Sequence, residues 1–254
     1  MTRLYIWNIR AAQTDAQIAH LTAQADSDVL ILTEYRQLVR GDRLSAALRQ
    51  AGWRHQHTHV LAPKLRGVII ASRSKLVPCP LESTLALGSL AANLAPHVAV
   101  ARLPEHHLTL VGVYMPYADG PLKETLWAAL NHYARAHTKE RLVIAGDFNS
   151  CVDGETEGRY LYTPRPLEVM RGATTDAWGV AAVARSIPDR DRFTWYSQGK
   201  YGTSGIRLDY AFLSPALTGA LIDARHDHAV REQGLSDHSA LIVDLEQMTF
   251  PSTL

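Results

Sequence analysis

The stretch GLSDHSALIVDL, residues 234–245, places Asp237 and His238 directly before the apolar run ALIV near the end of the chain. An apolar run that follows turn residues predicts a buried β-strand. Two ionisable side chains at the mouth of a buried strand cost free energy unless they contact water, a cation or a counter-ion. The stretch therefore raises the question of what these two side chains contact.

Other polar side chains stand in the same position, at or beside the ends of apolar runs: Asn8, Glu34, Asp147 with Asn149, and Asp209. Strand ends from distant parts of a chain meet at one edge of a sheet, where carboxylates stay hydrated or bind a cation. Taken singly, each has an ordinary interpretation as a turn, a cap or a surface carboxylate. Their joint occurrence favours one functional site.

The rest of the sequence predicts alternating strands and helices. Strands are expected at 4–7, 29–32, 67–73, 97–103, 108–116, 141–149, 207–213 and 238–245, and helices at about 15–25, 44–52 and 122–137. The strand at 29–32 should stop at Thr33 and Glu34, and Thr14 with Gln17 forms a capping box before the first helix. The long stretches 148–168 and 185–206 are expected to be irregular functional loops. Because no low-complexity linker divides the chain, we expect one α/β domain over 1–248 and a short tail, 249–254.

The composition excludes several classes of protein. Lys and Arg number 26 against 25 Asp and Glu, so a basic surface for nucleic acid has to be local. The two cysteines, Cys79 and Cys151, form no disulfide framework. The chain enters a strand pattern at once, and no run reaches about 18 apolar residues. We expect a cytoplasmic protein with no membrane partner.

Six motifs in a fixed order carry a family resemblance: WN (7–8), TE (33–34), VYMP (113–116), GDFN (146–149), RLDYAF (207–212) and SDH (236–238). Together they resemble the endonuclease/exonuclease/phosphatase superfamily, which includes deoxyribonuclease I, exonuclease III and the abasic-site endonucleases. The resemblance runs from residue 3 to about 245 and looks strongest to the exonuclease III side. It implies a four-layer α/β sandwich, in which two mixed β-sheets pack face to face with helices outside. The site would lie at the edge where strands of both sheets end.

The resemblance also implies a divalent-metal-dependent phosphodiester hydrolase. Glu34 would bind the ion with Asn8 beside it, and Asp237 would be a second or water-mediated ligand. Because these are hard oxygen ligands without a Cys or His cluster, they favour Mg²⁺ or Mn²⁺ over zinc.

The remaining motif residues would act on water and phosphate. Asp147 would orient or deprotonate the attacking water, and Asn149 would hold the water and a phosphate oxygen. His238, paired with Asp209, would donate a hydrogen bond to the phosphate and stabilise its developing charge. Tyr114 would hydrogen-bond the phosphate or the leaving group.

Two positions depart from the family pattern. Tyr117 follows VYMP where abasic-site enzymes usually carry Asn, and Arg10 stands where many relatives carry Asp or Asn. An Arg there would contact phosphate rather than a cation. Both departures argue against abasic-site specificity while leaving phosphoester cleavage intact.

A basic and aromatic loop from Arg185 to Arg207 suits a nucleic-acid backbone and unstacked bases. Its proposed substrate contacts, together with Arg10 and Tyr117, are Arg190, Arg192, Trp195 and Arg207. Trp195 has an equal claim to be core, because FTW alternates like a strand. A second basic stretch, 64–75, is either another phosphate contact or a solvated rim. HQHTH (55–59) places three histidines on one face and is expected to be a solvated edge strand rather than a metal site.

The leading hypothesis is a monomeric DNA endo- or exonuclease without a protein partner. The alternative is a phosphatase or phosphodiesterase of the same fold that acts on a small phosphoester, a nucleotide, RNA or a lipid head group. A catalytically inactive binding protein ranks last, because Glu34, Asp147, Asp209 and His238 are all present.

Overall fold

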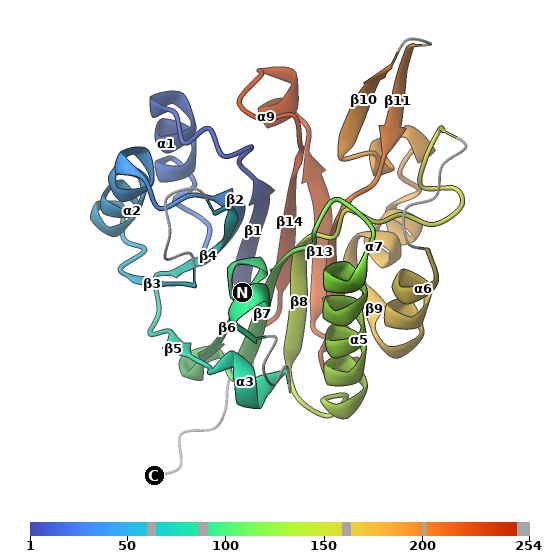
Figure 1. Ribbon diagram of the computed structural model, residues 1–254, viewed down its shortest axis with the longest axis horizontal. Helices are drawn as coiled ribbons and strands as arrows, with labels where there is room; N and C mark the ends of the chain where they lie inside the picture. The colour runs from blue at the N-terminus through green and yellow to red at the C-terminus, as the bar shows by residue number, and fades with distance from the viewer. Residues whose placement is uncertain (60–64, 86–90, 159–163, 200–201, 248–254) are drawn as a thin grey trace.

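Two six-stranded β-sheets face each other in the computed structural model, which describes residues 1–59, 65–85, 91–158, 164–199 and 202–247 (Figure 1). The first sheet has the spatial order β13 (Leu221–Asp227), β14 (Ala240–Leu245), β1 (Thr2–Asn8), β2 (Val29–Tyr35), β4 (Gly67–Ser72), β3 (His55–Thr58). The second has the order β5 (Val77–Pro78), β6 (Val98–Leu103), β7 (Leu108–Tyr114), β8 (Leu142–Asp147), β12 (Asp209–Leu213), β9 (Thr175–Asp176). A separate hairpin pairs β10 (Trp195–Gly199) with β11 (Gly202–Ile206). Both large sheets are mixed, because β1 runs parallel to β2 and β7 parallel to β8 while their other neighbours are antiparallel.

Helices cover the outer faces of both sheets (Figure 1). The helices are α1 (Asp15–Thr22), α2 (Val39–Gln50), α3 (Leu81–Thr84), α4 (Ala91–Leu94), α5 (Pro121–Ala136), α6 (Pro164–Ala173), α7 (Ala177–Arg185), α8 (Pro215–Thr218) and α9 (Ala229–Glu232). Short 3₁₀ helices are η2 (Ala95–His97), η3 (Pro104–His106) and η4 (Asp189–Arg192). None of the helices in the described ranges is long and apolar enough to cross a membrane.

The strand alternation explains the layers. In β1, Leu4 and Ile6 point into the core between the sheets, whereas Tyr5 and Trp7 point outward into the core beneath α1 and α2. A third core lies between the second sheet and α5 with α6. The order helix, sheet, sheet, helix is the predicted four-layer sandwich, so the fold class is confirmed.

Gly112 of β7 sets the spacing of the two sheets at the centre of the sandwich. A Cβ at this position would lie 2.7 Å from Val68 Cγ1 and 3.1 Å from Ile31 Cγ2, which belong to the opposite sheet. Only a residue without a side chain fits such a close approach. This close packing fixes the position of one sheet relative to the other, and with it the positions of the polar residues at the ends of their strands.

Several predicted boundaries shift in the structure. The capping box of Thr14 and Gln17 is present, and α1 ends at Thr22 rather than near residue 25. Strand β2 continues through Glu34 to Tyr35. The stretch 148–168, expected to be irregular, includes the start of α6, and 185–206 contains η4 and the β10–β11 hairpin. The tail at 249–254 lies outside the described residues.

Candidate active site

Strand pairing brings the polar side chains of distant segments together at the end of the sandwich from which the β10–β11 hairpin projects (Figure 1). Asn8 stands at the last position of β1, and its neighbour on β2 is Thr33, next to Glu34. Asp147 ends β8, where its ladder neighbours are Tyr114 on β7 and Asp209 on β12. The edge predicted from the sequence is thus a real meeting point of both sheets.

Asp147 is almost fully buried and sits at the centre of a hydrogen-bond network. Asn8 Nδ2 donates to its Oδ2 at 2.8 Å, and the backbone N–H of Asn149 donates to its Oδ1 at 2.9 Å. Asn149 adopts a left-handed backbone, with φ of 42°, and its side-chain amide donates to the carbonyl of Met115 at 2.8 Å. The loop after β8 is therefore fixed by its own polar groups, and its aspartate is held in one orientation.

His238 and Asp209 form a buried pair opposite Asp147. The imidazole Nδ1 lies 2.8 Å from Asp209 Oδ2, while the indole N–H of Trp7 donates to the His238 carbonyl at 3.1 Å. Asn8 Nδ2 lies 3.5 Å from His238 Nε2. With Nδ1 occupied by Asp209, the other ring nitrogen is directed at the Asn8–Asp147 side of the site.

Burial and neighbouring charge set opposite protonation tendencies in this cluster. Burial raises the pKa of Asp147 to about 7, the charge of Asp209 adds to that rise, and the His238 cation opposes it. Burial disfavours a charged His238, but the Asp209 carboxylate outweighs it and raises the imidazole pKa to about 10. At neutral pH the imidazole is a cation, and the Asp147 carboxyl is close to its midpoint of ionisation.

Glu34 lies on a β-bulge of β2. Its backbone is left-handed, with φ of 58°, and the pairing of β2 with β4 shifts register between Thr33 and Tyr35. The bulge turns the carboxylate toward Asn8, whose Nδ2 donates to Oε1 at 3.3 Å. Arg66 Nη1 donates to the other oxygen, Oε2, at 2.8 Å.

Arg66 is the functional candidate that sequence reasoning did not single out. It belongs to the basic stretch 64–75, within which Lys64 lies outside the described residues. Its guanidinium occupies one oxygen of a carboxylate expected to bind a cation. The only signal in the sequence was that residues 64–75 contain several Lys and Arg and no Asp or Glu.

The side chains at this edge fit a hard divalent cation. The possible ligand atoms of Asp147, Asp209 and His238 lie within 4.8 Å of one another. Asp209 Oδ1 is buried without a hydrogen-bond partner, and the Glu34 carboxylate already holds a positive group in Arg66. Carboxylate oxygens in excess over fixed positive charge are the donor set that Mg²⁺ and Mn²⁺ use. This cluster differs in membership from the ligand set expected from the sequence, which was Glu34, Asn8 and Asp237.

A cavity of about 340 Å³ opens over these residues. It is lined by Glu34, Arg66, Tyr114, Tyr117, Asp147, Asn149, Trp195, Ile206, Leu208, Asp237 and His238. Tyr117 is 69% exposed at this cavity. Trp195 is partly buried against the small apolar cluster that contains Cys151, and it also lines the cavity, with its indole N–H 3.3 Å from Asp237 Oδ2.

Two predicted residues lie at the solvent side of the site. The Asp237 side chain is 39% exposed, and Arg10 is 64% exposed with its Nε 3.8 Å from Asp237 Oδ2. At this distance and exposure the ion pair is loose, so Arg10 is available to another anion.

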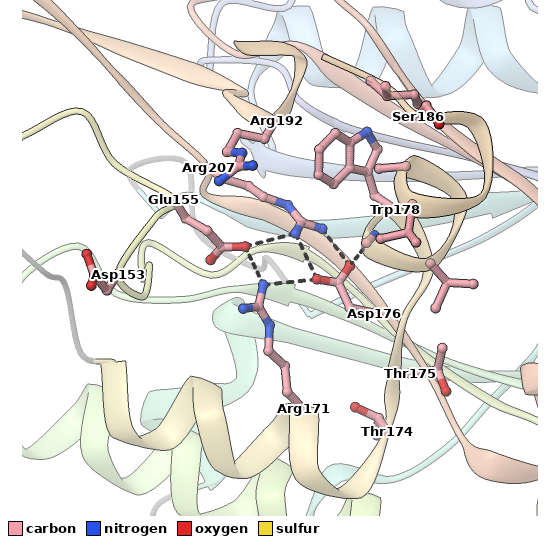
Figure 2. A pocket seen from close by; sticks show the side chains of 15 residues that line it. Asp153, Glu155, Arg171, Thr174, Thr175, Asp176, Trp178, Ser186, Arg192 and Arg207 are labelled. Atoms are coloured by element: carbon pink, nitrogen blue, oxygen red, sulfur yellow. Dashed lines mark hydrogen bonds and ion pairs between the residues drawn. The ribbon is translucent and has the colours of Figure 1, made fainter. Parts of the chain in front are cut away.

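Arg207 was wrongly predicted to contact substrate. Its side chain is only 2% exposed, and its guanidinium binds Asp176 Oδ1 at 2.5 Å and Glu155 Oε1 at 2.9 Å. Figure 2 shows these two carboxylates around Arg207, with Arg171 bridging the same pair from the other side. Burial of this Arg207 cluster is tolerated because every charge in it has a partner of opposite sign. A substrate phosphate could reach Arg207 only by displacing one of its carboxylate partners.

Arg192 lies with the Arg207 cluster rather than with the active site. Its Nη1 donates to the carbonyl of Gly154, and it lines a second cavity, of about 740 Å³, beside Arg207 (Figure 2). This cavity is larger than the one over Asp147, but it shares no lining residue with it. The side chain of Arg190 lies outside the described residues.

Comparison with known proteins agrees with this geometry. The model of the endonuclease/exonuclease/phosphatase family matches residues 6–238. A comparison with curated proteins gives no match.

Three solved structures illustrate the likeness in fold. A 3′ phosphatase from Neisseria, bound to a product DNA hairpin, is 22% identical, with a TM-score of 0.75 over 97% of this chain and 100% of that chain. A 3′–5′ exonuclease from Neisseria meningitidis is 22% identical, with a TM-score of 0.75 over 96% and 100%. An AP endonuclease from Archaeoglobus fulgidus is 18% identical, with a TM-score of 0.76 over 97% and 100%.

The family match contains all the polar residues that the two sheets bring to one edge, from Asn8 to His238, and the fold of these structures is the same four-layer sandwich. The chain belongs to the endonuclease/exonuclease/phosphatase family of phosphoester-cleaving enzymes.

Proposed function

We propose that this protein is a divalent-metal-dependent phosphodiester hydrolase that cleaves a DNA strand with water as the nucleophile. The observation that carries the proposal is the convergence of Asp147 and His238 on one open cavity, with Glu34 at its wall. A base for water, a donor for phosphate and a carboxylate for a cation are the parts that this reaction requires.

Glu34, Asn8 and Asp237 are the proposed holders of the cation, with Asp209 Oδ1 as a further oxygen within the cluster. Mg²⁺ or Mn²⁺ at this position would polarise the scissile phosphate and stabilise its negative charge. Asn8 supports Glu34 and Asp147 together, because its single amide nitrogen contacts both carboxylates. Arg66 would leave Glu34 for a phosphate oxygen when the cation binds.

Asp147 is the proposed acceptor of the water proton. A pKa of about 7 is close to working pH, where a general base combines availability with driving force. His238 is the proposed donor to a non-bridging phosphate oxygen, since Asp209 keeps it cationic. Burial and the charges of Glu34 and Asp147 raise the pKa of Tyr114, so its phenol keeps its proton and donates to phosphate or leaving group.

DNA is the proposed substrate for two reasons. The similar structures include a 3′ phosphatase bound to a DNA hairpin and an AP endonuclease. In this chain the groups around the cavity suit a strand of nucleotides, because Arg10 and Arg66 offer phosphate contacts and Tyr117 and Trp195 offer rings for stacking. Tyr117 and Arg10 depart from the abasic-site pattern, so we propose that abasic-site cleavage is secondary. The proposed active species is a monomer.

The test is a cleavage assay on end-labelled DNA with Mg²⁺, with Mn²⁺ and with EDTA. The substrates are intact duplex, single strand, duplex with an abasic site, and duplex with a 3′ phosphate, beside a chromogenic phosphomonoester. We expect metal-dependent cleavage of intact or 3′-phosphorylated DNA at a rate that exceeds abasic-site cleavage. Hydrolysis of the small phosphomonoester with no action on any DNA would replace the nuclease by the phosphatase alternative.

A further inference from the structure

A second group of metal-ligating side chains lies outside the active site. His226 is the penultimate residue of β13, His228 follows two positions later, and Asp191 comes from η4, 35 residues before His226 in sequence. One ligand atom from each of the three lies within 4.8 Å of the other two. The group is distinct from the Asp147 cluster, with which it shares no residue.

The hydrogen bonds of His226 prepare its ring for a cation. Nδ1 lies 2.7 Å from the backbone carbonyl of Asp191, and because a carbonyl only accepts, Nδ1 must carry the proton. When the ring is neutral, Nε2 then carries the lone pair, and it is buried without a hydrogen-bond partner. A neutral imidazole whose other N–H is bonded to a carbonyl is the usual state of a metal-bound histidine.

His228 is supported in the same way. Its Nδ1 lies 2.7 Å from Ser239 Oγ, a hydroxyl oxygen that can accept a hydrogen bond from the ring N–H. Its Nε2 lies 3.2 Å from Asp191 Oδ1. Ligands about 2.0–2.1 Å from a tetrahedral ion stand roughly 3.3 Å apart, so this pair already has the separation of two zinc ligands.

The group is open enough for an ion to enter. The side chains of His228 and Asp191 are 20% and 37% exposed, whereas the ring of His226 lies deeper, stacked on Trp178. Arg207, whose charge acts on His226, is neutralised by Asp176 and Glu155, and Arg231 donates to Ser239 Oγ, which contacts Nδ1 rather than Nε2 of His228. Asp191 supplies the carboxylate of the group, at 37% side-chain exposure.

We propose that His226, His228 and Asp191 form a second cation site that binds zinc with water as the fourth ligand. Two imidazoles and one carboxylate favour zinc over Mg²⁺, which prefers oxygen ligands alone. Zinc at this site ties η4 to the end of β13. The segment after η4 carries Thr194, whose carbonyl accepts from the Ser239 N–H at 2.8 Å, and then Trp195 of the cavity wall. The site stabilises the segment that forms one wall of the active site.

The experiment measures zinc binding by competition with a chromophoric chelator, in excess Mg²⁺ so that the oxygen-rich active site is filled. We expect one tightly bound zinc per wild-type chain and an increase of thermal midpoint on adding zinc. His228→Gln and Asp191→Asn should each weaken zinc binding at least about tenfold and abolish the thermal shift. His57→Gln is the matched control, because it removes a histidine from the other histidine-rich segment, and it should bind zinc like wild type.

Asp147→Asn separates the two metal sites. This variant lacks an active-site carboxylate, so it should keep the zinc while losing turnover. Zinc binding that survives in both His228→Gln and Asp191→Asn, or that is lost in Asp147→Asn or His57→Gln, would overturn the assignment. The ring of His226 is buried, so His226→Gln is not used as a test variant because it could misfold. A second measurement is the visible absorption of bound Co²⁺, which should be present in wild type and absent in the folded His228→Gln protein.

Discussion

Two buried charge clusters lie on either side of Leu208, one built around Arg207 and the other containing Asp209. In the Arg207 cluster two arginines meet two carboxylates, and each carboxylate contacts both arginines. In the active site the three carboxyls of Glu34, Asp147 and Asp209 face two cations, His238 and Arg66, and one oxygen of Asp209 has no partner. A cluster whose positive and negative side chains neutralise each other stabilises the fold. A cluster with an unpartnered carboxylate oxygen can instead bind a cation.

Asp147→Asn should reduce turnover by about 10²–10⁴-fold, because it removes the general base while preserving shape. DNA binding should remain within a few-fold of wild type. Stability should not fall, since the native environment raises the pKa of Asp147 and so penalises its charged form. Turnover, filter binding and thermal midpoint measure these three effects, and an equal loss of DNA affinity would indicate a role in binding instead.

Arg207→Met should show the opposite pattern. Removing one partner from a buried ion cluster destabilises a protein by about 3–5 kcal/mol, and here Arg171 alone would be left to neutralise the carboxylates of Asp176 and Glu155. Turnover of the folded fraction should stay near wild type. The matched control is Arg192→Met, which should change the unfolding free energy by no more than about 1 kcal/mol. A DNA-affinity defect without a loss of stability would restore Arg207 to the substrate site.

Glu34→Gln should weaken the apparent affinity for Mg²⁺ by about tenfold or more, because a neutral amide replaces the charged ligand. Arg66→Met should strengthen Mg²⁺ affinity while weakening DNA binding, since Arg66 occupies Glu34 Oε2. Titration of activity with Mg²⁺ at saturating DNA separates the two. A wild-type Mg²⁺ titration for Glu34→Gln would remove it from the ligand set.

Asp209→Ala and His238→Ala should not be additive. Because Asp209 keeps the imidazole charged and oriented, losing either side chain should cost about as much activity as losing both. The coupling in a double-mutant cycle on turnover is expected to be about 0.5–3 kcal/mol. Additive losses would show that the two act separately.

The two clusters should impose opposite slopes on stability as pH changes. Burial opposes ionisation of Asp176, but Arg207 outweighs it and holds the pKa below the ordinary 3.8, so its stabilisation is present above about pH 3.8 and is lost as pH falls through the native value. The pKa of Asp147 is raised to about 7 in the folded protein. Its ionisation therefore lowers the free energy of unfolding as pH rises from 3.8 toward 7.

Denaturant titrations in EDTA across this pH range measure both slopes. Asp176→Asn should flatten the acid limb, and Asp147→Asn should flatten the decline between pH 4 and 7. Unchanged slopes in both variants would mean that other groups govern the pH response.

The sequence predicts the active site better than the surface around it. Asn8, Glu34, Asp147, Asp209 and His238 could be found because sheet geometry converts polar residues at strand ends into neighbours, and the ordered motifs strengthened that inference.

The environments of the arginines could not be found in the same way. Nothing local shows that Arg207 meets Glu155 and Asp176, which come from distant segments, so a basic loop looked like an exposed one. Arg66 was missed for the same reason, since its partner Glu34 lies 32 residues away, on β2. Helix α7 also escaped prediction, because its Asp176 cap and Gly179 resemble a turn.

The left-handed backbone of Glu34 and Asn149 has a consequence for protein engineering. Non-glycine residues in this conformation cost roughly 1 kcal/mol or more each, and glycine removes most of that cost. A selection for heat resistance alone would thus enrich Glu34→Gly and Asn149→Gly. The selected variants would be thermostable but inactive. Stabilisation of this enzyme should begin elsewhere, and an assay for cleavage has to accompany every round.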